Sequence, residues 1–179
     1  MSRRRIPGRE TTAAISNERR TWYGWGQLTR VEKSWFGLFL HDVTRLFAEI
    51  SVISLPVLLA AMAAPATGWF DAKATGLVAW ATLVVTATLI RIGTVPPIGS
   101  ETPGWVTLAP ELIVLRVGYF NGGLAAAIFG GLAVHDSIGT LVTSDTAGIA
   151  FGLGWALAIS VGMALVFPRV AEEWLSIVR

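Results

Sequence analysis

Two His-Asp pairs are the residues of this sequence best suited to chemistry by type and spacing. His41-Asp42 and His135-Asp136 carry both histidines of the 179-residue chain, and a histidine beside a carboxylate is a common arrangement for general acid–base catalysis. Neighbouring side chains on a helix point in different directions, however. The two pairs are also far apart in the sequence, so we do not expect them to form one site. We predict no catalytic residue and no enzymatic activity.

Motifs typical of metal, cofactor and nucleophilic sites are missing from the sequence. The chain has no cysteine, which excludes disulfides, thiolate metal sites and thiol catalysis. Two histidines alone would leave a zinc or haem site short of ligands. A Walker A segment, a G-x-S-x-G turn and an HExxH motif are also absent. We therefore expect neither a metal site nor a cofactor.

A second group of residues with chemical interest consists of charges inside or beside long apolar segments: Glu49, Arg91, Glu111 and Arg116. A charge within a membrane costs roughly 2.5–3.5 kcal/mol on insertion scales and is a candidate for function by default. One interpretation is an ion or proton vestibule. The favoured interpretation is structural, in which Arg45 and Glu49 pair at i, i+4 and the arginines extend to the interface.

Four apolar segments must position these residues. A bilayer core about 30 Å thick needs roughly 20 apolar residues in a helix, and lipid-exposed backbone must satisfy its own hydrogen bonds. With 53% hydrophobic and 15% charged residues and a mean hydropathy of +0.60, the chain is too apolar for a soluble domain. We predict an all-α integral membrane protein with four transmembrane helices, at about 46–66, 75–95, 112–134 and 147–167.

Basic residues are concentrated before the first apolar segment. Nine of the 14 arginines and lysines precede Leu46, and cytoplasmic segments of membrane proteins carry an excess of such residues. We therefore predict a cytoplasmic N-terminus, and four spans return the C-terminus to the same side (N-in/C-in). Residues 135–146 are then expected to form an outer loop, in which Asp136 or Asp145 caps a helix.

The segments outside the spans divide the chain into two parts. Residues 1–30 are predicted to form a basic cytoplasmic arm that contacts anionic lipid headgroups or an acidic partner, with nucleic acid as a less favoured alternative. Residues 31–179 are predicted to form the four-helix membrane domain. Within it, amphipathic patterns indicate interfacial helices near both cytoplasmic ends, at about 31–45 and 169–179.

Two prolines predict where helices bend or begin. Pro56 lies inside the first apolar segment, where its missing N–H is expected to kink the helix near Val52. Pro110 is followed by Glu111 and suits the start of the third helix, because proline fits the first helical position. A negative charge is also favourable there.

Small residues at intervals of four are the most specific pattern in the apolar segments. They let helix backbones approach closely, so that van der Waals contact drives association in lipid. The third segment has Gly122, Ala126 and Gly130, with Gly123, Ala127 and Gly131 beside them. The fourth has Gly148, Gly152, Ala156, Ser160 and Ala164, with Gly154, Ala158 and Gly162 beside them. Either the two helices pack on each other within one chain, or one stripe faces another subunit.

These patterns predict a function that depends on helix packing. We expect a non-enzymatic membrane subunit that serves as a structural, anchoring or assembly component of a larger membrane complex or membrane-containing particle. Its partners would be the lipid bilayer and other membrane subunits or copies of itself. The alternative is a small oligomeric channel or transporter whose charged residues line an inner vestibule.

Overall fold

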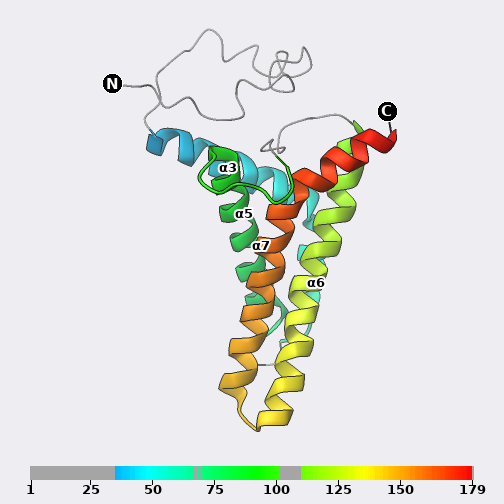
Figure 1. Ribbon diagram of the computed structural model, residues 1–179. Coiled ribbons are helices and arrows are strands. Elements are labelled where there is room, and N and C mark those ends of the chain that lie inside the picture. The colour runs from blue at the N-terminus through cyan, green and yellow to red at the C-terminus, as the bar shows by residue number, and fades with distance from the viewer. Residues whose placement is uncertain (1–34, 67, 69, 101–109, 179) are drawn as a thin grey trace.

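The computed structural model describes residues 35–66, 68, 70–100 and 110–178 (Figure 1). This part of the chain contains no strand, and its helices are α3 (Trp35–Ile53), α4 (Leu55–Ala63), α5 (Ala72–Ile92), α6 (Pro110–Val142) and α7 (Asp145–Val178). The all-α prediction is thereby confirmed for the described residues. The basic arm at 1–30 and the start of the predicted interfacial helix at 31–45 lie outside them.

Three of these helices have the length and hydropathy of a membrane span, namely α5, α6 and α7. α3 and α4 meet the same criteria only as a pair, which is bent by 69° at the break between them. The structure thus agrees with a membrane protein that has several helical spans. The number of spans and the side on which the termini lie stay predictions.

The first predicted span is broken in the middle. Ser54 separates α3 from α4, and Pro56 lies in the first turn of α4, so the predicted interruption by this proline is confirmed. α3 itself runs without a break from the predicted interfacial segment into the predicted span, so no helix end lies near residue 45. In Figure 1, α3 (blue to cyan) lies across one end of the bundle that the other helices form.

α6 and α7 form a long antiparallel hairpin. With 33 and 34 residues, each helix is about 50 Å long. The outer loop predicted at 135–146 is wrong for most of its length, because only Thr143 and Ser144 separate the helices. Polar residues here mark the end of the apolar region rather than the end of a helix. The hydroxyl of Ser137, for example, donates to the carbonyl of Ala133 at 2.7 Å and leaves the helix intact.

The remaining helix ends follow from local sequence. Asp71 caps α5, since its Oδ1 accepts hydrogen bonds from the backbone N–H groups of Lys73 and Ala74. Gly93 ends the helix in the left-handed region at φ 83°, which glycine adopts at little cost. α6 begins at Pro110, as predicted.

α7 continues through Pro168 to Val178. The separate interfacial helix predicted at 169–179 is therefore wrong as a separate element, although the end of α7 (red in Figure 1) bends across the end of the bundle. A proline inside a helix removes one backbone hydrogen bond and bends the axis without ending the helix when the flanking turns are stable.

Polar residues gather at two levels of the bundle, with an apolar layer between them. Arg116 and His135 mark these levels on α6 and are about 28 Å apart along the helix at 1.5 Å per residue. That distance matches the hydrocarbon thickness of a bilayer. Side chains such as Leu83, Leu124 and Ala156 fill the layer and are fully buried. The start of α3 and the end of α7 lie at the same end of the bundle (Figure 1).

Candidate functional site

The candidate site is a group of buried charges where α3 meets α5 and α6. Glu49 on α3 and Arg116 on α6 form an ion pair, with 2.7 Å between Oε1 and Nη1. Arg116 is 2% exposed, and its guanidinium carbon lies 5.9 Å from the centre of the Phe167 ring, within the range of a cation–π contact. Glu49 thus binds a distant helix, whereas the sequence favoured its i, i+4 neighbour Arg45.

A second ion pair joins α3 to α5. The Nε atom of Arg91 lies 3.2 Å from Oδ1 of Asp42, and both side chains are 9% exposed. The His41 Nδ1 atom is 3.4 Å from the same oxygen. We call Asp42, Glu49, Arg91 and Arg116 the charged layer.

Sequence reasoning found three of these four residues and missed Asp42. The missed signal is spacing, because Asp42 and Glu49 are seven residues apart and lie on one face of a helix. Two acids on one face of α3 meet one arginine from each of two helices. Glu111 was also predicted to join this group; it lies in the first turn of α6, and its side chain lies outside the described part of the structure.

The charged layer contains more unpaired donors than unpaired acceptors. Among the described residues, Nε and Nη2 of Arg116, Nη1 of Arg91 and Oε1 of Glu49 are buried without a hydrogen-bond partner, so the Glu49–Arg116 contact is an ion pair without an aligned hydrogen bond. Unpaired buried donors normally cost about 1–3 kcal/mol each, and more when charged. The unpaired N–H groups of the two arginines can therefore donate hydrogen bonds to a ligand that carries oxygen atoms.

Asn121 on α6 fills the break between α3 and α4. Its Nδ2 donates to the carbonyls of Ile53, at 2.8 Å, and Val117, and its Oδ1 accepts from the N–H of Val57 at 3.1 Å. A broken helix leaves backbone groups without partners, and in an apolar environment those groups need one. The role of Asn121 is not visible in the sequence, because its partners Ile53 and Val57 lie more than 60 residues away and come close to it only in the folded chain.

The first stripe of small residues on α7 faces the interior of the chain. All five of its members are buried: Gly148, Gly152, Ala156, Ser160 and Ala164. A Cβ atom on Gly152 would lie 2.7 Å from the backbone oxygen of Gly131 and from the ring of Phe70. A Cβ atom on Gly148 would lie equally close to the backbone oxygen of His135. These glycines allow α6 and α7 to approach closely.

The stripe on α6 that meets α7 is the one beginning at Gly123. Ala127 is fully buried, and Cβ atoms on Gly123 and Gly131 would clash with Met163 and with the Gly152 backbone. Gly122 and Ala126 point outward instead.

Gly130 has a separate role within the chain. The indole of Trp155 lies against it, since a Cβ atom there would be 2.5 Å from Nε1. That Nε1 donates to the backbone oxygen of Ala126 at 3.0 Å. Gly130 therefore provides space for a tryptophan from α7 and does not serve the outward face.

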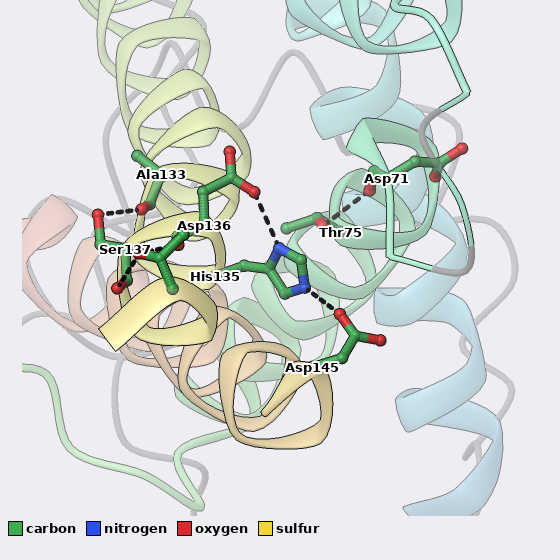
Figure 2. A network of polar contacts seen from close by, with 8 residues as sticks. Asp71, Thr75, Ala133, His135, Asp136, Ser137 and Asp145 are labelled. Atoms are coloured by element: carbon green, nitrogen blue, oxygen red, sulfur yellow. Dashed lines mark hydrogen bonds and ion pairs between the residues drawn. The ribbon is translucent and has the colours of Figure 1, made fainter. Parts of the chain in front are cut away.

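The second polar level is centred on His135, near the tip of the hairpin. Figure 2 shows its ring between two carboxylates, with Nδ1 3.1 Å from Asp136 and Nε2 3.2 Å from Asp145. The expectation that neighbouring His and Asp side chains do not meet is wrong here, because rotation of the ring brings Nδ1 to Asp136. The ring also lies 4.9 Å from that of Phe70. This arrangement fastens α6 to α7 and to the segment before α5.

The described residues contain no group of three or more histidines and acids arranged to hold a metal ion. Each nitrogen of His135 is already occupied by a carboxylate, which suits a structural contact. The two His-Asp pairs also lie on elements at opposite ends of the bundle, α3 and the far end of α6 (Figure 1).

Comparison with known proteins assigns the chain to a family. A family model described as Domain of unknown function (DUF8215) matches residues 33–174, and the chain belongs to this family. The match extends from the start of α3 into the last turns of α7. No curated protein and no solved structure matches the chain.

Proposed function

We propose that the chain is a non-catalytic integral membrane subunit that packs against helices of other membrane subunits or of further copies of itself. The observation that carries this proposal is the double set of small residues on α6 and α7. One stripe on each helix lies in the contact between α6 and α7, and a second stripe on each helix points outward.

The outward stripes are open surfaces. On α6 the stripe consists of Gly118, Gly122 and Ala126, and on α7 of Gly154, Ala158 and Gly162. Cβ atoms built on the four glycines would meet nothing within 4 Å. Lipid chains pack as well against leucine as against glycine, so packing alone gives no advantage to small residues on a lipid face. A second helix gains close backbone contact from them.

The charges of the bundle favour the packing role over an open vestibule. Arg116 is 2% exposed, and Glu49 and Asp42 on α3 turn inward to the arginines. A vestibule would need these groups to face water. Their pairing instead ties α3 to the bundle.

We further propose four membrane crossings with both termini on the cytoplasmic side. α3 contributes Asp42 and Glu49 to the charged layer, whereas Phe70, beyond α4, contacts His135 at the other level. The broken pair and the segment after it therefore supply one crossing, and α5, α6 and α7 supply three. The excess of basic residues before Leu46 supports the orientation, and the basic arm is then positioned to contact anionic headgroups or an acidic partner.

The packing proposal is tested by Leu substitutions on the outward stripes. Gly122→Leu and Gly154→Leu should leave the fold intact but reduce oligomers or co-purifying membrane proteins after extraction in mild detergent. Ala60→Leu is the matched control, because Ala60 is an exposed small residue on α4 outside both stripes. The proposal fails if the wild-type chain is a lone monomer both in mild detergent and in native membranes.

A transporter is the second candidate function, and the broken helix pair favours it. Discontinuous helices in transporters often surround a substrate site near the middle of the membrane, and Asn121 lies at such a break. Selective solute flux in proteoliposomes that Arg116→Ala abolishes would favour this function over packing. Absence of flux together with recovery of a stable complex would favour the subunit.

A further inference from the structure

The most unusual feature outside the packing surfaces is the set of unused donors in the charged layer. Arg116 is 2% exposed and the Arg91 side chain 9% exposed. Nε and Nη2 of Arg116 and Nη1 of Arg91 have no hydrogen-bond partner in the described structure. Both arginines pair with acids on the same helix, Arg91 with Asp42 and Arg116 with Glu49 of α3.

The acids of α3 do not satisfy these donors. Glu49 approaches one nitrogen of Arg116, and Asp42 approaches one nitrogen of Arg91. Each guanidinium has five N–H groups in a planar fork, and that fork matches the oxygens of a carboxylate or phosphate. A group with several oxygens could therefore bind the donors of both arginines at once.

α3 is the element that covers this position, because its Asp42 and Glu49 lie against the two arginines. It joins the rest of the described chain through a 69° break at Ser54. Its outward side carries Phe36 and Leu40, which contact nothing in the core and are more than half exposed. A tilt of α3 about the break would uncover both arginines and leave α5 and α6 in place.

We propose that the charged layer is a binding site for a phosphate-type oxyanion, which Arg91 and Arg116 hold together beneath α3. The layer lies at one edge of an apolar region as thick as a bilayer, which is the depth of lipid phosphates. The oxyanion is supplied either by an anionic lipid headgroup or by free phosphate. This site is independent of the outward stripes and of the proposed function.

The test measures binding to the full-length chain with two probes. Nanodiscs of phosphatidylcholine with or without phosphatidylglycerol, followed by native mass spectrometry, report retained lipid. Inorganic phosphate added to the detergent-solubilised chain, followed by thermal unfolding, reports free anion. Retention of phosphatidylglycerol alone identifies a headgroup, and stabilisation by inorganic phosphate identifies a free anion. Both outcomes support the site.

Two substitutions should act in opposite directions. Glu49→Gln removes a competing carboxylate and should tighten binding about tenfold, whereas Arg116→Gln should weaken it about tenfold, the effect of one charge-assisted hydrogen bond. If Arg116→Gln does not fold, the double variant Glu49→Gln/Arg116→Gln is compared with Glu49→Gln and should bind about tenfold more weakly than that single variant. Arg169→Gln is the control, since Arg169 is an exposed arginine that pairs with Glu173 on its own helix.

Three results would overturn the proposal. The first is no binding of either probe to the wild-type chain. The second is a Glu49→Gln variant that binds no more tightly than the wild type. The third is binding by Glu49→Gln/Arg116→Gln that is as tight as binding by Glu49→Gln, because lipid or phosphate would then bind elsewhere on the protein.

Discussion

Replacing Gly152 by alanine perturbs the closest contact between α6 and α7. The added methyl group would lie 2.7 Å from the backbone oxygen of Gly131 and 2.7 Å from the Phe70 ring. Real Cβ atoms essentially never come closer than 3.0 Å to such neighbours. Neither neighbour is the flexible end of a long side chain, so the helices must separate or Phe70 must leave its position.

The expected magnitude follows from two opposing terms. Overpacking a close contact costs typically about 1–3 kcal/mol, and alanine gains up to about 1 kcal/mol over glycine in helix propensity. With the full propensity gain subtracted, we expect Gly152→Ala to lower the free energy of unfolding by up to about 2 kcal/mol. Gly154 is two residues away on the same helix and has open space around it, so Gly154→Ala should be neutral or stabilising by up to about 1 kcal/mol.

The assay is reversible unfolding of the two variants and the wild type in one detergent, with circular dichroism as the signal. The comparison cancels helix propensity, because both variants make the same substitution within one helix. Equal effects of Gly152→Ala and Gly154→Ala would refute the reasoning. That result would mean that the helices are not held in backbone contact by the stripe containing Gly152.

Three further predictions concern the break, the ion pair and the topology. Asn121→Leu should lower the free energy of unfolding by about 1–3 kcal/mol, because two backbone groups at the break lose their partner. Asn121→Asp keeps the oxygen that accepts from Val57 and should therefore lose less stability. Glu49→Ala should lower the free energy of unfolding by about 3–5 kcal/mol, because it leaves a buried arginine unpaired, whereas Glu49→Leu/Arg116→Met should lower it far less. Equal losses in the two variants would contradict the ion pair. Because the chain has no cysteine, Thr140→Cys and Ser176→Cys allow a labelling test with an impermeant maleimide, and we expect only Ser176→Cys to react from the cytoplasmic side.

The sequence predicted those features that local chemistry controls. The existence of the helices follows from long apolar segments, and the break at Ser54 and the start of α6 follow from Pro56 and Pro110. The end of α6 was not predictable in the same way. Hydrophobicity reports where a segment leaves the apolar layer, but a helix can continue beyond that layer, as α6 does past His135.

Sequence patterns could not show which stripe or which side chain meets which helix. Both stripes on α6 have the same spacing, and their sequences do not indicate which one faces α7. Large neighbours decide this in three dimensions, since Met163 occupies the space next to Gly123 and Trp155 the space next to Gly130. The partner of Glu49 was missed for the same reason, because a local partner at i−4 competes with an arginine that is far away in sequence.

The charged layer also implies an order of assembly. Arg91 and Arg116 lie on α5 and α6, and without α3 both would be unpaired at the edge of the apolar layer, at roughly 2.5–3.5 kcal/mol each on insertion scales. The contact of α6 with α7 needs no charge, because it rests on small residues and apolar packing. The hairpin can therefore form first, and α3 then docks as its two acids neutralise the arginines. Loss of Asp42 and Glu49 together should consequently release α3 while the α6–α7 contact persists, and equal loss of both contacts would contradict this order.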